Sequence, residues 1–201
     1  MKISEKVMKV LLALCGFTAV AFLIVITCFL VVSGLPAIKE IGLKEFLLGT
    51  SWKSTASSPS YGILPFILTS LYGTLGAIII GVPLGIMCSI FISKMAPDPV
   101  KKAVSTAVDL LSGIPSVVFG LLGMIIIVPT VRKVFSLPDG ANLFSAIIVL
   151  AVMILPSVIS VSSTAITAVP KEYEEASLAL GATKTETVFK VTVPAAKSGI
   201  I

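Results

Sequence analysis

PKEYEEASLALGATKTETVFKVTVP, residues 170–194, is a polar and charged stretch in an otherwise apolar chain. Pro170 suits the first position of a helix, and the glutamates that follow it carry the charge that a helix N-terminus favours. Gly181 predicts the end of that helix, because glycine adopts the turn conformation without a Cβ clash. The first half of the stretch is therefore expected to form one short helix.

The second half of the stretch predicts another helix. Thr183 and Glu186 stand three residues apart, as the two members of a capping box do. Pro194 lacks a backbone N–H and should end this helix. The local signals thus predict a helix-turn-helix, either as a simple link between two membrane spans or as a surface for another protein.

The composition is that of a membrane protein. Of the 201 residues, 56% are hydrophobic and only 12% are charged, which is more apolar surface than a soluble domain of this length can bury. A transmembrane helix needs about 20 apolar residues. Four segments satisfy this requirement: 8–32, 64–93, 108–131 and 143–168. We therefore expect an all-α integral membrane protein with four transmembrane helices.

The first apolar segment follows three lysines, Lys2, Lys6 and Lys9, as the apolar part of a secretory signal peptide also does. Its apolar run is too long for such a peptide, and no cleavage site of the small-x-small type closes it. We expect it to remain as an uncleaved membrane anchor.

The distribution of Lys and Arg predicts the orientation. With the N-terminus in the cytoplasm, ten of the 15 basic residues lie inside and five lie outside, as the positive-inside rule requires. Topology and anionic lipid headgroups then account for the net charge of +5 without a nucleic-acid partner. The expected cytoplasmic segments are 1–7, 94–107 and 169–197, the external ones are 33–63 and 132–142, and 198–201 begins a further span.

Neither a metal site nor a cofactor is expected. Cys15, Cys28 and Cys88 all lie in expected spans with no metal-like spacing, and the chain contains no histidine. Buried cysteines of this kind behave as small apolar residues. No candidate catalytic residue emerges.

The sequence does not predict a nucleotide site of its own. Residues 181–185 read GATKT, whereas a phosphate-binding loop needs Lys directly after its last Gly. Any function that consumes energy would then depend on a partner ATPase or on an ion gradient. A gradient-driven carrier usually has titratable groups at membrane depth, and here Asp109 lies only at the edge of an expected span. A partner ATPase is favoured, with a secondary carrier as the alternative.

Small residues, prolines and hydroxyls mark the expected spans. Gly81 and Gly85 surround Pro83 and predict close helix contact, and Pro156 lies within the fourth span. Hydroxyl groups in such helices either line a polar path or bond to the preceding turn of backbone. The candidate residues for a translocation path are Ser112, Ser116, Ser157 and Ser160.

The polar stretch resembles the EAA signature of the membrane subunits of ABC importers. The pattern Glu-Ala-Ala, three residues, Gly, nine residues, Ile-x-Leu-Pro is matched here by Glu175-Ala176-Ser177, Gly181, Val191 and Val193-Pro194. Ser177, Val191 and Val193 are the departures from the pattern, and all three are conservative.

Further segments resemble the phosphate-specific ABC permeases of the PstC type. They are YGILP (61–65), GVPLGI (81–86), LSGIPSVVFGL (111–121) and MILP (153–156), preceded by an external segment that contains Phe46, Gly49 and Trp52. Lys94 is a departure, because the family usually has an acidic residue there.

This resemblance implies a bacterial cytoplasmic membrane permease that imports inorganic phosphate. It also implies that the chain is not itself an enzyme, since a partner subunit hydrolyses ATP. Its implied partners are ABC ATPase subunits, a second, PstA-like permease subunit and an external phosphate-binding protein, with membrane lipid around the spans. Complete family members have six spans, so two more would follow the polar stretch. Sulfate or molybdate import is the alternative within the same class.

The resemblance also implies roles in coupling to the ATPase. Glu175 would cap or anchor the first helix of the polar stretch, and Gly181 would provide the turn. Tyr173, Ala176 and Leu180 are spaced as one helical face and would pack against the ATPase or against the body of the permease.

Overall fold

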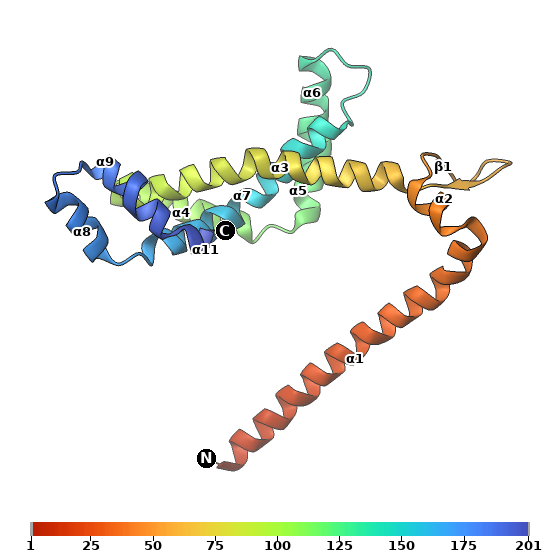
Figure 1. Cartoon of the computed structure of the whole chain (residues 1–201), viewed down its shortest axis with the longest axis horizontal. Helices are drawn as coiled ribbons and strands as arrows, with labels where there is room; N and C mark the ends of the chain where they lie inside the picture. Colours follow the sequence, from red (N-terminus) through yellow and green to blue (C-terminus); the bar gives the residue numbers. More distant parts are fainter. Residues whose placement is uncertain (1, 201) are drawn as a thin grey trace. The chain divides into compact units, whose positions relative to one another are not determined.

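The computed structural model describes the backbone of residues 2–200 and the side chains of residues 6–200. The chain divides into two compact units, Met1–Leu68 and Thr69–Ile201. Figure 1 shows that helices dominate both units.

The first unit contains one long helix and a small hairpin. α1 (Lys2–Ile41) is followed by α2 (Leu43–Leu48) and by the antiparallel strands β1 (Trp52–Lys53) and β2 (Ser60–Tyr61). The Trp52 ring meets the rings of Tyr61 and Phe66 edge to face, with both pairs of ring centroids 5.6 Å apart. None of the side chains described in α1 is buried, as expected of a helix that exposes apolar residues to lipid or to another helix.

The second unit begins within α3 (Leu64–Ile90), which leads into a π-helical turn, η1 (Phe91–Met95). The elements that follow, in chain order, are α4 (Asp98–Ser112), α5 (Ser116–Leu122), the π-helical η2 (Gly123–Ile127), α6 (Val128–Val134), α7 (Leu143–Thr167), α8 (Lys171–Ala179), α9 (Lys184–Thr187), the π-helical η3 (Val188–Thr192), α10 (Val193–Ala195) and α11 (Lys197–Ile200).

Four helices in the described part are long and apolar enough to cross a membrane: Lys6–Ile41, Leu64–Met95, Ser116–Val134 and Leu143–Thr167. The expected all-α membrane architecture is confirmed. The third helix begins later than the sequence suggested, because residues 108–112 belong to α4. Pro115 has no N–H to donate and disfavours helix in the residue before it, so the chain breaks between Ser112 and Ser116.

The helices α3 and α7 approach each other closely through glycine, at the contact expected from the sequence. A Cβ on Gly81 would lie 2.7 Å from Ile154 Cδ1, and one on Gly85 would lie 2.6 Å from Val158 Cγ1. Real Cβ atoms do not approach so closely. The absence of a side chain at these two positions therefore sets the separation of the two spans.

The end of the polar stretch differs from the expectation. Pro194 does not end the helix but stands at the start of α10, because η3 widens the preceding turn and the Val193 N–H bonds to Val188 O. A π-helical turn shifts the hydrogen-bond partner by one residue, and proline is tolerated where its missing N–H has no partner to lose.

Two apolar clusters hold the second unit together. One joins the ends of α3 and α7 to η3 and α10, and its buried members are Ile90, Ile166, Val169, Val188 and Ala196. The other joins η1, α4 and α7 through Ile92, Val108 and Ile159. The segment from α8 to α11 therefore gathers at the end of α3 that leads into η1, as Figure 1 shows.

Candidate functional site

The helix-turn-helix that the sequence predicts is present as α8, a turn and α9. Gly181 has a φ of +86°, a conformation that residues with a Cβ rarely adopt, and it makes the turn. The Glu186 N–H donates to Thr183 Oγ1 at 3.3 Å, and the Thr183 N–H donates to Glu186 Oε2 at 3.1 Å. This capping box is the one expected from the spacing.

The capping box perturbs the acidity of Glu186. The hydrogen bond from the Thr183 backbone N–H, together with those from Lys190 and from the Thr183 hydroxyl, lowers the pKa of Glu186 to about 2. Each of these contacts favours the ionised carboxylate. The cap of α9 is therefore charged at any physiological pH.

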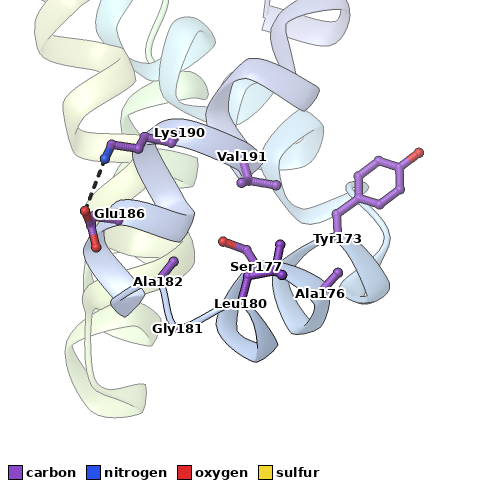
Figure 2. A pocket seen from close by; sticks show the side chains of 9 residues that line it. All are labelled: Tyr173, Ala176, Ser177, Leu180, Gly181, Ala182, Glu186, Lys190 and Val191. Carbon is purple, nitrogen blue, oxygen red and sulfur yellow. Dashed lines mark hydrogen bonds and ion pairs between the residues drawn. The ribbon is translucent and has the colours of Figure 1, made fainter.

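A groove of about 500 Å³ lies between the two arms of the helix-turn-helix. Figure 2 shows residues of α8 on one side of it and the ion-paired Glu186 and Lys190 on the other, joined through the turn at Gly181. The lining residues are Tyr173, Ala176, Ser177, Leu180, Gly181, Ala182, Glu186, Lys190 and Val191.

The residues predicted to pack against a partner or the permease body lie on α8 and at its C-cap, Leu180, and are exposed in this chain. Leu180 is 90% exposed and Tyr173 is 54% exposed, and Ala176 between them is also exposed. A leucine at this exposure gains nothing from the fold of the chain itself. Glu175, expected to anchor the helix, is exposed and forms no side-chain hydrogen bond or ion pair within the described part of the chain.

The anchoring carboxylate is the neighbouring one, which sequence reasoning did not single out. Glu174 Oε1 accepts a hydrogen bond from Lys94 Nζ, with which it forms an ion pair, and another from Thr192 Oγ1 at 3.1 Å. The Lys94 and Glu174 side chains are only 18% and 25% exposed, and Thr192 is fully buried. The sequence marked Lys94 as unusual for the family, but no local pattern pairs it with Glu174, which lies 80 positions later.

The same contacts keep Glu174 ionised. Burial alone would raise the pKa of Glu174, but the hydrogen bonds from Lys94 and Thr192 and the charges of Lys94 and Lys171 outweigh it. The pKa of Glu174 therefore lies below its ordinary value.

A second hydroxyl contact closes the helix-turn-helix. The Ser177 and Thr187 hydroxyl oxygens lie 2.9 Å apart and share a hydrogen bond between α8 and α9. Thr187 is 3% exposed. An alanine at position 177, as in the signature that this stretch resembles, could not form this bond.

The candidate path residues do not all line one of the cavities described in the structure. Ser112, Ser116, Ser157 and Ser160 are all exposed in this chain. Ser160 alone among them lines a polar cavity of about 130 Å³, whose other lining residues are Ile92, Ser105, Val108, Asp109, Ile159, Ser163 and Thr164.

Some hydroxyls of α7 bond to the preceding turn of backbone, which was the alternative role considered for them. Thr164 Oγ1 donates to Ser160 O at 2.9 Å, and Thr167 Oγ1 donates to Ser163 O at 2.7 Å. Ser163 itself shares a hydrogen bond of 2.8 Å with Ser93 in η1. These three hydroxyl groups therefore already form hydrogen bonds within the chain.

The sequence around this site matches a known protein family. Residues 81–201, which include η1, α7 and the whole helix-turn-helix, match the model of the binding-protein-dependent transport system inner membrane component. The chain belongs to this family. Together with the four apolar helices, this membership makes it a multi-pass membrane protein.

Relatives in this family carry more specific names. A probable ABC transporter permease protein, YqgH of Bacillus subtilis, is 41% identical over 190 residues, which is 94% of this chain and 62% of the relative. The phosphate transport system permease protein PstC of Haemophilus influenzae is 32% identical over 216 residues, covering 98% of this chain and 68% of the relative. PstC 2 of Mycobacterium tuberculosis is 28% identical over 215 residues, covering 98% and 66%. These matches confirm the resemblance to ABC permeases that include the PstC type.

A solved structure shares the fold. A chain of the MetNI methionine ABC transporter in an inward-facing conformation superposes with a TM-score of 0.50 at 25% identity, over 67% of this chain and 60% of that one. The present chain thus spans about 62% of the Bacillus subtilis relative and 60% of this structural neighbour.

Proposed function

We propose that this chain forms part of the membrane permease subunit of an ABC importer for inorganic phosphate, and that α8 and the turn at Gly181 dock onto an ATPase subunit. The observation that carries this proposal is the 90% exposure of Leu180 beside the groove of about 500 Å³. An apolar knob next to a groove is the kind of surface that a partner covers.

Several properties of the helix-turn-helix suit such a surface. The capping box and the Ser177–Thr187 hydrogen bond fix the angle between its arms, so little conformational entropy is lost when a partner binds. The Lys94–Glu174 ion pair and the apolar cluster around Ile166 connect it to the membrane spans. Movement of a docked ATPase would therefore reach the spans.

Phosphate as the substrate is supported by the relatives that are named phosphate transport system permeases and by the residue patterns at 61–65 and 111–121. The family description supports an external binding protein as a partner, and the resemblance to the PstC type implies a second, PstA-like permease subunit. Sulfate and molybdate remain outcomes that the experiment must distinguish.

The orientation follows from the distribution of basic residues, with the N-terminus and the helix-turn-helix in the cytoplasm. In a variant without native cysteines, an Ala182→Cys thiol should react with a membrane-impermeant maleimide only after the cells are opened. A Ser57→Cys thiol should react in intact spheroplasts. The reverse pattern would refute the orientation.

Uptake measurements test the proposed function directly. Cells that lack the complete gene should lose uptake of labelled phosphate at limiting concentration and regain it with a plasmid copy. Uptake of labelled sulfate and molybdate should not change. Unchanged phosphate uptake together with a sulfate or molybdate defect would preserve the permease role and overturn the substrate.

A further inference from the structure

The contact of α8 with the membrane spans is narrow. Within the described part of the chain, α8 has no buried residue. Two of its side chains form hydrogen bonds: Ser177, which reaches Thr187 inside the helix-turn-helix, and Glu174, which reaches Lys94. Glu174 is therefore the side chain through which α8 is bonded to the membrane-spanning segment Leu64–Met95.

The bond is directional, unlike the apolar contacts nearby. Lys94 lies in η1, which continues α3 without a break, and Thr192 of η3 donates to the same Glu174 oxygen. The cluster around Ile166 also joins these elements, but apolar surfaces can slide past each other at little cost. A partly buried ion pair with a second hydrogen bond holds its members at a fixed distance.

Glu174 lies on the side of α8 that faces the membrane spans, next to the surface proposed to meet the ATPase. Tyr173, directly before it, is 54% exposed on the surface proposed to meet the ATPase, whereas the Glu174 side chain is 25% exposed and turned toward the spans. One short helix thus presents a docking face and an anchoring face. A push on the first face displaces the carboxylate on the second.

We infer that the Lys94–Glu174–Thr192 bridge transmits the movement of α8 to the cytoplasmic end of α3, which makes Lys94 and Glu174 positioning residues for transport. This inference rests on the proposed function. A merely structural bridge would be needed only for assembly of the subunit. A transmitting bridge is also needed for ATP hydrolysis to drive transport.

Two neutral substitutions, made singly and together, separate a transmitting role from a structural one. Lys94→Met and Glu174→Gln each leave one partly buried charge without its partner, which also disturbs folding. The double variant K94M/E174Q leaves no unpaired charge, so a structural role alone predicts that it regains wild-type behaviour. A transmitting role predicts that the double variant assembles and remains uncoupled, because the bond is still missing.

The measurement uses the complete transporter in proteoliposomes. The quantity measured is the ratio of labelled phosphate imported to ATP hydrolysed. We expect this ratio to fall about tenfold in each single variant and to a similar extent in the double variant, since members of one bond are not additive. The reversed pair K94E/E174K should recover at least half of the wild-type ratio. Exposed Glu172→Gln on the same helix and Lys101→Met on α4 are the matched controls and should leave the ratio unchanged.

A second readout requires no transported solute. Spin labels at Met87→Cys on α3 and Val161→Cys on α7, in a chain without native cysteines, should change separation when ATP is added to the wild-type transporter but not to the K94M/E174Q variant. The inference would be overturned if the double variant behaved as the wild type in both assays. It would also be overturned if neither the double variant nor the reversed pair assembled. If the wild type moves with ATP and K94M/E174Q does not, but the wild type imports no phosphate, the proposed function is refuted and the bridge remains supported.

Discussion

The Ser177 and Thr187 hydroxyls meet at 2.9 Å and tie α8 to α9 across the turn. Thr187 is buried, so a Ser177→Ala variant would leave its hydroxyl without this partner. We expect the variant to lose about 1 kcal/mol of stability, the usual value of one such bond. Thermal unfolding of the purified chain in detergent measures this loss. Ser57→Ala, an exposed change of the same kind, should unfold as the wild type does.

The turn at Gly181 requires glycine because of its backbone conformation and not because a side chain would clash with its surroundings. A Cβ there would meet no heavy atom within 4 Å, but the φ of +86° disfavours residues with branched side chains. Gly181→Val should leave the protein in the membrane while ATP hydrolysis no longer drives uptake. Gly181→Asn should retain coupling, because asparagine tolerates this conformation. Wild-type uptake by the valine variant would contradict the role of the turn.

The exposed Leu180 should contribute strongly to binding of the ATPase subunit. Because a central apolar anchor of an interface is worth roughly 2 kcal/mol or more, Leu180→Asn is expected to weaken binding by about 30-fold. Titration of the purified ATPase against the permease in nanodiscs measures this. Leu110→Asn removes a leucine that is 70% exposed on α4 and should bind normally. Equal binding by both variants would place the interface elsewhere.

The contact between α3 and α7 should not tolerate a methyl group. A Cβ on Gly85 would lie 2.6 Å from Val158 Cγ1, so Gly85→Ala is expected to cost about 1–3 kcal/mol through overpacking. Adding Val158→Ala should restore much of this loss. Gly120→Ala, where nothing lies within 4 Å, is the control in thermal unfolding. If the second substitution brought no recovery, Val158 would not be the obstacle.

The capping box should weaken in acid. The pKa of Glu186 falls from 4.5 to about 2 on folding, so its stabilising effect is complete above pH 4.5 and disappears as the pH approaches 2. The difference in melting temperature between the wild type and Glu186→Ala should shrink over this range. Glu186→Gln keeps the cap without a titrating group and should show no such dependence relative to alanine. A constant difference from pH 6 to pH 2 would contradict the lowered pKa.

Local features of the fold were readable from the sequence because they depend on residues close in the chain. The apolar segments, the turn at Gly181 and the capping box of Thr183 and Glu186 each arise from spacings of a few residues. The third span was misplaced at its start, since composition alone does not show that Pro115 separates α4 from α5. The continuation of helix past Pro194 was also missed, because it depends on the π-helical turn before it.

By itself, the sequence determined that the chain is helical, that it crosses a membrane, and that a polar helix-turn-helix follows the fourth span, because periodicity, hydropathy and capping act over short distances. Only the tertiary structure decided which side chains anchor that motif. Glu174 and not Glu175 meets Lys94, and Ser177 meets Thr187, since these pairings depend on how α3, α7 and η3 pack around α8. Packing brings together residues 80 positions apart, and no local rule specifies such a pair.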